Sequence, residues 1–423
     1  LIAYYFTPTV QGYYFTFYTL LALQVFVELG LGNVVQQFAS HEWSHLRMDE
    51  TGQIEGDPSA ISRLGSIARL SFRWFFYAAI LLTIVLIILG FIFFQDSDTG
   101  AVAWRRPWVA ISILTGASVF FVPFWSLLEG CNQVNALYKF RFVSSALTLL
   151  PFLGGIVLGA NLWVPAIASG ATVILSIIFL RRYRRFFGSM LTHIPGGAVV
   201  NWKTEVLPLH ARVAVSWMSS YFAFNLFTPV LFKYEGPVIA GQFGMTWLIL
   251  SVISAVANSW LQPRTPQFGM LIAQHDYHRL DSLFWKLVKI IFLLSLLAGF
   301  ALYLGLYIAP LLNIGFVDKI LGRLLPMEAM LYLLAAQVLQ IVSTPFAAYL
   351  RMHKKEPLMW LSLLSSLAIG AATVCFASLY SVEEVCMGYF GVILLTTPFV
   401  YIIWHSFREN IRARAVTGPE GQV

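Results

Sequence analysis

The chain has 423 residues, of which 58% are hydrophobic and only 11% are charged. A soluble domain carries about 25% charged residues, so this composition excludes an ordinary soluble protein. The formal net charge is +7, but the Lys and Arg residues are spread over many connections and form no single basic patch, which argues against nucleic-acid binding.

Long apolar runs separated by short polar connections cover most of the chain. Each run is long enough for a helix to cross the hydrocarbon core, and the runs lack the period-two alternation of membrane barrel strands. Residues Leu1–Phe6 resemble the end of a first span, so we expect most of the first helix to be missing. Eleven whole spans are expected, at Gly12–Ala39, Ile67–Phe94, Trp108–Cys131, Phe142–Leu158, Trp163–Leu180, Leu207–Phe232, Val238–Leu261, Leu287–Ala309, Met327–Leu350, Leu358–Tyr380 and Met387–Trp404.

The positive charges alternate between the connections. All but five of the 27 Lys and Arg residues lie in or beside every second connection, or in the C-terminal tail. Positive residues mark the cytoplasmic side of a multi-pass protein, so this alternation predicts a cytoplasmic C-terminus. The exceptions are Arg105, Arg106, Lys233, Lys319 and Arg323.

Two short patterns recur in the two halves of the chain. Thr7–Tyr14 and Gly236–Phe243 keep Pro, Val or Ile, Gly and aromatic residues at the same spacing, each before a span. At the far ends of these spans, Ala39–Trp43 is echoed by Ala273–Tyr277. Both copies enter from the same side, which predicts a parallel repeat of two helical lobes, residues 1–187 and 188–423.

These motifs carry a resemblance to a known family. Phe6–Tyr14 (FTPTVQGYY), Val27–Gly32 (VELGLG), Gly236–Phe243 and Pro266–Ala273 resemble the polysaccharide-export branch of the multidrug/oligosaccharidyl-lipid/polysaccharide (MOP) exporter superfamily, which includes O-antigen and teichoic-acid flippases. The resemblance implies two six-helix lobes around a central cavity, worked by alternating access. It also implies a substrate, an undecaprenyl-pyrophosphate oligosaccharide flipped across the bacterial inner membrane.

Glu28 is the foremost candidate site residue, in the middle of the second span with Gln24 one turn earlier. A lone carboxylate in hydrocarbon costs about 3 kcal/mol, so it must face a wet cavity or a partner, or be protonated. It either lines the cavity, coupling H⁺ or Na⁺ or contacting the substrate, or it forms a structural hydrogen bond to a neighbouring helix. Gly30 and Gly32 beside it favour close helix packing or bending.

The other candidates have both functional and structural interpretations. Glu129, late in the fourth span, contacts the substrate or reaches water at the interface. His210 and Arg212 lie at the start of the seventh span. Arg212 and Arg264 either bind the pyrophosphate of a lipid carrier or extend their side chains to the membrane interface. Amides in the second lobe suit sugar hydroxyls or hydrogen bonds between helices: Asn225, Gln242, Asn258, Gln262, Gln337 and Gln340.

Two alternative functions remain open. A cation-coupled multidrug antiporter of the same superfamily would favour acids at mid-depth in the second lobe, and the sequence has none there. His41–His45 matches the H-E-x-x-H motif of zinc proteases, but it lies in the longest polar connection, His41–Arg63, which we expect to be a loop with a short helix. The sequence has no ATP-binding or dinucleotide motif, so we expect a transporter without a cofactor, whose partners are the substrate, membrane lipids and a coupling cation.

Overall fold

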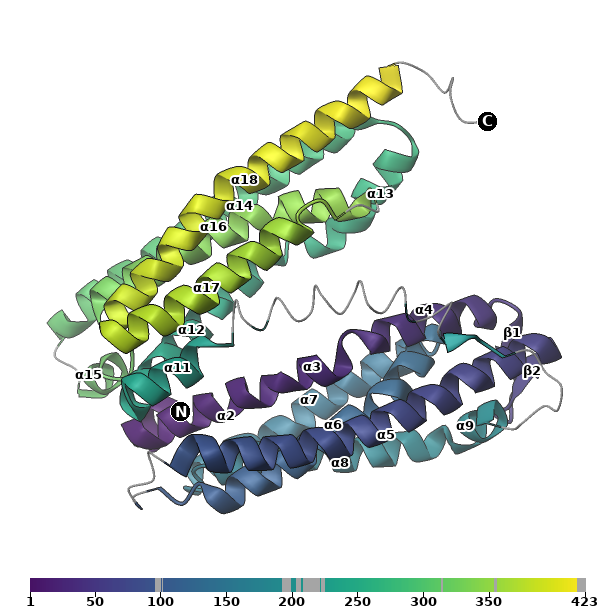
Figure 1. Ribbon diagram of the computed structural model, residues 1–423, viewed down its shortest axis with the longest axis horizontal. Helices are drawn as coiled ribbons and strands as arrows, with labels where there is room; N and C mark the ends of the chain where they lie inside the picture. Colours follow the sequence, from purple (N-terminus) through teal and green to yellow (C-terminus); the bar gives the residue numbers. More distant parts are fainter. Residues whose placement is uncertain are drawn as a thin grey trace. The chain divides into compact units, whose positions relative to one another are not determined.

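The structure is a computed structural model that describes residues 1–95, 100, 102–191, 199–202, 207, 221, 225–312, 315–353 and 356–416. These residues are almost entirely helical and form two compact units, Leu1–Tyr221 and Phe222–Val423 (Figure 1). Within the described ranges, nine helices are long and apolar enough to cross a membrane, or ten if a bent pair is one span. The predicted fold class, an all-α multi-pass membrane protein of two helical lobes, is confirmed. The lobe boundary at 187/188 and the central cavity stay predictions.

Unit 1 begins with a short helix and a span made of several pieces, followed by a small hairpin and four long helices. Its elements are α1 (Ile2–Tyr5), α2 (Pro8–Leu21), the 3₁₀ turn η1 (Ala22–Gln24), α3 (Val25–Glu28), α4 (Leu31–Trp43), β1 (Leu46–Met48), β2 (Ile54–Gly56), α5 (Pro58–Phe94), α6 (Arg105–Gly130), α7 (Val134–Val157), α8 (Trp163–Arg182) and α9 (Arg184–Leu191).

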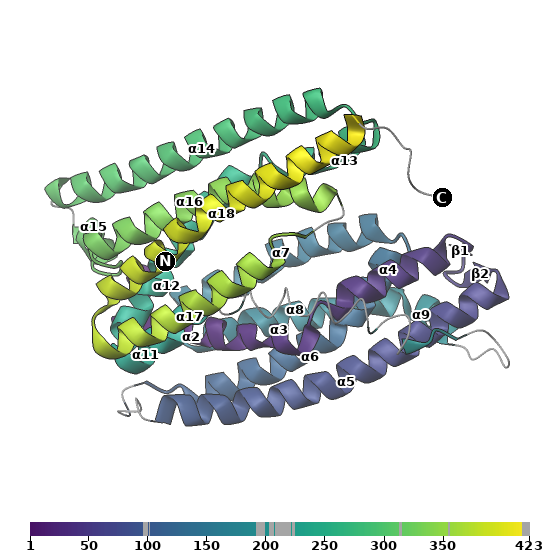
Figure 2. The ribbon, with the colours of Figure 1, turned by 45° about the horizontal axis from the view of Figure 1, so that its top comes forward.

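The described residues of unit 2 form five long helices and several short ones. Its elements are α11 (Phe227–Tyr234), α12 (Pro237–Asn258), the 3₁₀ turn η4 (Gln262–Arg264), α13 (Thr265–Ala273), α14 (Tyr277–Ile308), the 3₁₀ turn η5 (Ala309–Leu312), α15 (Gly315–Leu321), α16 (Met327–Met352), α17 (Met359–Leu379) and α18 (Val382–Val416). The long helix α14 lies alongside α16 (Figure 2). Ten of the predicted spans have a helical counterpart; the other, Leu207–Phe232, falls largely outside the described residues.

Helix starts follow the polar residues in front of the apolar runs. Thr7 caps α2, where its hydroxyl accepts the Val10 amide at 3.2 Å, and Pro8 occupies the first helical position. Asp57 caps α5 and Asp276 caps α14 in the same way, through the amides of Ser59 and Arg279. Helices α5 and α14 thus begin with polar turns before their apolar runs. We expect these first turns to lie outside the hydrocarbon.

The connection between α4 and α5 holds a two-stranded antiparallel hairpin, so the expected short helix is wrong there. The turn explains the difference. The Asp49 carboxylate accepts the Gln53 amide at 2.6 Å and the Thr51 hydroxyl at 2.7 Å, and Gly52 adopts a left-handed φ of 84°. Local side-chain hydrogen bonds of this kind favour a turn over a helix.

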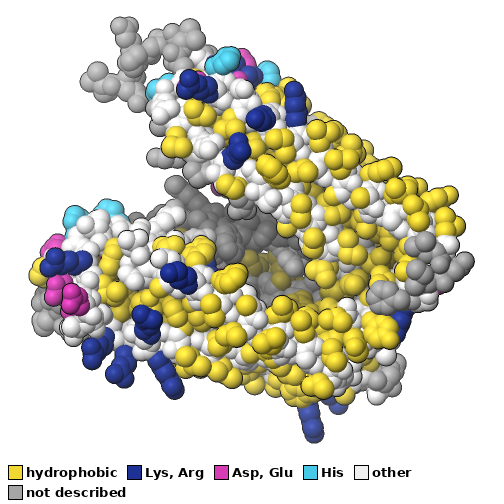
Figure 3. Space-filling view, turned by 180° about the vertical axis from the view of Figure 1, so that it is seen from behind, with side chains coloured by type: hydrophobic (Ala, Val, Ile, Leu, Met, Phe, Trp, Pro, Cys, Tyr) yellow, Lys and Arg dark blue, Asp and Glu magenta, His cyan; other side chains and the backbone are white. Residues whose placement is uncertain are grey.

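Aromatic side chains hold each unit together. In unit 1, the buried Trp108 of α6 packs against Phe17 of α2 at 4.9 Å and Phe94 of α5 at 5.8 Å between ring centroids. In unit 2, Phe284 of α14 stacks on Trp404 of α18 at 4.9 Å. The flanks expose apolar side chains and the ends of the helices carry the charges, as a bilayer requires (Figure 3).

Candidate functional site

The span that carries Glu28 is broken in its middle. After α2 the chain passes through η1 into α3, and then Leu29 and Gly30 adopt left-handed φ values of 45° and 71°. The helices on either side are bent by 44°. A positive φ is expected for glycine but strained for leucine, so surrounding contacts must hold Leu29 in place. The bend expected from Gly30 is confirmed, and Glu28 is the last helical residue before it.

Glu28 is half-buried and has no hydrogen-bond or ion-pair partner among the described residues, and Gln24 is half-buried one turn before it. The other residues of the break line an apolar cavity of about 670 Å³ between α3 and α5. Phe26, Val27 and Leu29 line it from the break, and Trp74 and Tyr77 from α5. The break therefore brings a carboxylate beside a space lined mainly by aromatic and aliphatic side chains, with the cationic Arg73 of α5 also in the lining.

Gly32, near the start of α4, allows this helix to pack closely on α6. A Cβ at this position would lie 3.0 Å from both Ser126 Oγ and Val122 Cγ1, so the glycine permits close contact of the two helices. The expected close packing at Gly32 is therefore confirmed.

Unit 2 has a corresponding interruption. Its helix α12 ends at Asn258 and is followed by η4 and α13. The Asn258 side-chain amide donates to the Ser254 carbonyl at 3.0 Å and contacts its hydroxyl at 3.3 Å. The buried Asn258 Oδ1 has no hydrogen-bond partner in the described part of the chain. A buried carbonyl oxygen without a partner is costly, so it is an acceptor that a ligand or water can satisfy.

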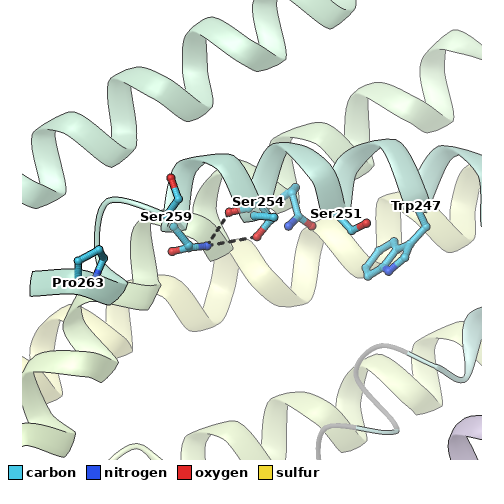
Figure 4. A pocket seen from close by; sticks show the side chains of 8 residues that line it. Trp247, Ser251, Ser254, Ser259 and Pro263 are labelled. Atoms are coloured by element: carbon cyan, nitrogen blue, oxygen red, sulfur yellow. Dashed lines mark hydrogen bonds between the residues drawn. The ribbon is translucent and has the colours of Figure 1, made fainter. Parts of the chain in front are cut away.

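Asn258 and Gln337 both line a pocket of about 650 Å³. Figure 4 shows this pocket, with Trp247, Ser251 and Ser254 on α12. Gln337 comes from α16 and its side chain is only 8% exposed. The pocket is lined by Trp247, Ser251, Ser254, Ala255, Asn258, Ser259, Pro263 and Gln337. None of these eight described residues is charged, so the pocket offers neutral donors and acceptors beside an indole face.

The sequence analysis missed the serines and Trp247 of this pocket. The signal was present, because Trp247, Ser251, Ser254 and Asn258 follow one another at steps of four, three and four residues. That spacing places them on one face of α12. A polar stripe on an otherwise apolar helix was therefore the pattern to look for.

Several other candidates have structural partners. Arg141 of α7 pairs with Glu129 of α6 at 2.7 Å. The Gln242 amide donates to the Gly322 carbonyl at 3.1 Å, and the Tyr389 hydroxyl donates to Gln340 Oε1 at 2.9 Å. These contacts tie helices and loops together, which favours the structural interpretation for Gln242 and Gln340. The ion pair of Glu129 with Arg141 is neither of the two roles expected for this carboxylate.

The remaining candidates do not gather at either site. Arg264 is half-buried at the start of α13, and Asn225 lies in the turn before α11 rather than inside a helix. His210 and Arg212 lie outside the described residues. Their proposed contact with a pyrophosphate stays a prediction.

The H-E-x-x-H stretch does not have the geometry of a zinc protease. Helix α4 ends at Trp43, so His41 and His45 do not share a helical face. Glu42 is buried and pairs with Arg63 Nε at 2.8 Å, so its carboxylate binds a guanidinium. Within the described residues, no group of three His, Cys, Asp or Glu side chains could hold a metal ion.

Comparison with known proteins shows which fold these two units form. No family model and no curated protein matches the sequence. Among solved structures, an inward-facing multidrug resistance MATE family transporter of the MOP superfamily matches with a TM-score of 0.64 and 14% identity, over 95% of this chain and 94% of that one. A MATE protein in complex with MaL6 matches with a TM-score of 0.59 and 15% identity, over 96% and 89%.

A third match is a MOP superfamily transporter from Pyrococcus furiosus, with a TM-score of 0.59 and 16% identity over 96% of this chain and 88% of that one. That protein is described as having a binding pocket of reverse polarity, which suggests a different function for it. Likenesses at such identities establish the fold. The chain is a multi-pass membrane protein with the fold of MATE transporters of the MOP superfamily.

Proposed function

We propose that this chain is an alternating-access transporter of the MOP superfamily that exports organic molecules in exchange for a cation. The observation that supports it is the likeness of fold over 95% of the chain to a multidrug resistance transporter. This likeness favours the multidrug antiporter over the lipid-linked oligosaccharide flippase that the sequence motifs suggested. The bacterial inner membrane, with the C-terminus in the cytoplasm, is part of the same proposal.

Glu28 is the residue that we propose for coupling. It ends α3 at a break in a membrane span, where the helix leaves its last carbonyl groups without an intrahelical partner. Broken spans of this kind bind ions and substrates in transporters because their backbone polar groups face a cavity. A single carboxylate can take up and release a proton, so we propose H⁺ as the coupling ion. The adjoining apolar cavity, with Trp74 and Tyr77, suits a hydrophobic aromatic substrate.

The experiment measures efflux of a fluorescent lipophilic dye from cells that lack their own multidrug exporters. We expect the wild-type chain to support proton-dependent efflux and Glu28→Gln to reduce it to near background. Glu50→Gln is the matched control, because Glu50 is an exposed carboxylate in the hairpin turn. Normal efflux by the Glu28 variant would exclude coupling through this carboxylate. Absence of efflux by the wild-type chain would exclude the multidrug function.

A second candidate function, flipping of a lipid-linked oligosaccharide, is favoured by the pocket on α12. Its hydroxyls and amides match the donors and acceptors of a sugar, and the Trp247 indole offers an apolar face for a sugar ring. The unpartnered Asn258 Oδ1 would accept a sugar hydroxyl.

This candidate is tested in a strain that lacks its surface-glycan flippase. Restored surface glycan, reduced by Asn258→Ala and not by Ser378→Ala, would support it. Ser378 is an exposed serine of α17 outside the pocket. If surface glycan is not restored by the wild-type chain, the flippase function is excluded for that glycan.

A further inference from the structure

A second pocket in unit 2 lies away from the Asn258 pocket, between the first turns of α14 and the last turns of α18. Its volume is about 980 Å³. Lys286 and Lys289 line it from α14, and Arg408 and Arg412 from α18, so four cationic side chains share one space.

The negative charge at this pocket is smaller than the positive charge. One carboxylate, Asp281, accepts hydrogen bonds from both arginines: Arg408 Nη2 lies 2.5 Å from Asp281 Oδ2, and Arg412 contacts the same oxygen. Arg408 also pairs with the exposed Glu409 at 3.5 Å. Lys286 and Lys289 have no acidic partner in the described part of the chain. The pocket therefore retains two uncompensated ammonium groups next to the arginine pair.

The pocket lies where the polar end of α14 meets its apolar length. Lys289 is directly followed by the run 290–308, which is apolar apart from Ser295 and two glycines. Trp285, which also lines the pocket, is 37% exposed, as aromatic residues are at the membrane–water interface. We therefore expect the pocket to lie at the depth of the lipid headgroups.

An exposed apolar stripe continues from the pocket along the same helix. Phe292, Leu296 and Phe300 follow Lys289 at steps of three and four residues, so they share its face of α14. Their side chains are 43%, 49% and 61% exposed. Figure 3 shows unit 2 with Lys, Arg and His side chains gathered at one end and hydrophobic side chains along its flank. The face as a whole complements an amphiphile with an anionic head and apolar tails.

We propose that this α14–α18 pocket binds the phosphate headgroup of an anionic membrane phospholipid, whose acyl chains lie along the exposed stripe of α14. Guanidinium and ammonium groups are the side chains that bind phosphate oxygens most strongly. The site is distinct from both candidate transport sites and does not depend on which molecule is transported. It would anchor the cationic end of unit 2 in the headgroup layer.

The test reconstitutes the full chain in phosphatidylcholine vesicles that contain spin-labelled phosphatidylglycerol or spin-labelled phosphatidylcholine. The protein-bound fraction of each label gives the relative affinity. We expect wild-type protein to prefer phosphatidylglycerol, and Lys286→Gln with Lys289→Gln to reduce this preference roughly 25-fold, because each cation near a lipid surface contributes about five-fold. Both lysines are exposed, so the double variant is expected to fold, which its melting temperature checks.

Arg181→Gln with Arg182→Gln is the matched control, because these exposed cations end α8 in unit 1. The control should keep the preference. An equal loss of the phosphatidylglycerol preference in both double variants would show that the preference comes from the positive charge of the whole protein surface, and it would overturn the proposal. Displacement of the labelled lipid by soluble inorganic pyrophosphate would also overturn it, since the pocket would then be a site for a free phosphate compound.

Discussion

Substitution of Gly90, which contacts Trp108, tests whether the Trp108 ring holds α2, the first half of the broken span, in place. Gly90 of α5 faces the indole of Trp108, and a Cβ at this position would overlap the indole nitrogen. The buried Trp108 Nε1 donates to the Leu86 carbonyl at 2.9 Å, and its ring packs on Phe17 of α2. Gly90→Ala should therefore displace the ring that joins α2, α5 and α6.

The magnitude follows from three contributions. Overpacking of a tight core costs about 1–3 kcal/mol. Loss of the Trp108 hydrogen bond leaves a buried donor unsatisfied, at about 1–3 kcal/mol. The helical preference of alanine over glycine returns about 1 kcal/mol. We therefore expect Gly90→Ala to lower the free energy of unfolding by about 1–5 kcal/mol.

The assay is thermal unfolding of the purified protein in detergent, followed by tryptophan fluorescence. Gly154→Ala in α7 is the matched control, because no atom lies within 4 Å of a Cβ added there. It should leave stability unchanged or raise it by up to about 1 kcal/mol. If the two variants melt at the same temperature, the described packing of α5 on α6 is refuted.

Two further predictions concern the connection between α4 and α5. Glu42→Gln removes the charge partner of Arg63, whose side chain is 29% exposed. The free energy of unfolding should fall by about 1–2 kcal/mol in the same assay. A melting temperature that falls when a zinc chelator is added would contradict this account. Hydrogen bonds from Thr51 and Gln53 hold the pKa of Asp49 below its usual value. The stability that they give the hairpin is present above the unfolded pKa of about 3.9 and is lost as the pH falls through the lower folded pKa. Protection of the hairpin amides from hydrogen exchange should therefore persist down to about pH 4 in the wild type and be reduced at neutral pH in Asp49→Ala; loss of protection already at pH 6 in the wild type would contradict it.

The spans could be predicted because a bilayer permits few structures. The expected Trp108–Cys131 is observed as Arg105–Gly130, and the expected Leu358–Tyr380 as Met359–Leu379. Hydropathy reports only the part of a helix inside hydrocarbon. It therefore missed the polar first turns of α14, which begins at Tyr277 rather than Leu287.

The local features that shape the sites were harder to predict. The hairpin had a recognisable turn sequence, Asp49–Gly52, but the expectation of a short helix ignored it. The left-handed conformation of Leu29 could not be predicted, because leucine disfavours it and the residue type therefore gives no signal for it. The pairing of Glu129 with Arg141 joins two helices across a turn, and neither residue alone predicts the other as its partner.

The repeat predicted from the sequence relates the two candidate sites, because Glu28 and Asn258 lie at similar positions in its two copies. Glu28 follows Pro8 by 20 residues, and Asn258 follows Pro237 by 21, so the two residues end helices at points of the predicted repeat that differ by one residue. The backbone interruption is therefore shared, but the side chain at it differs: a carboxylate in unit 1 and a neutral amide in unit 2. Only the carboxylate can change charge between states of the protein. Under the proposed antiport, Glu28 would exchange a proton at its interruption, whereas Asn258 at the corresponding interruption of unit 2 offers only neutral donors and acceptors.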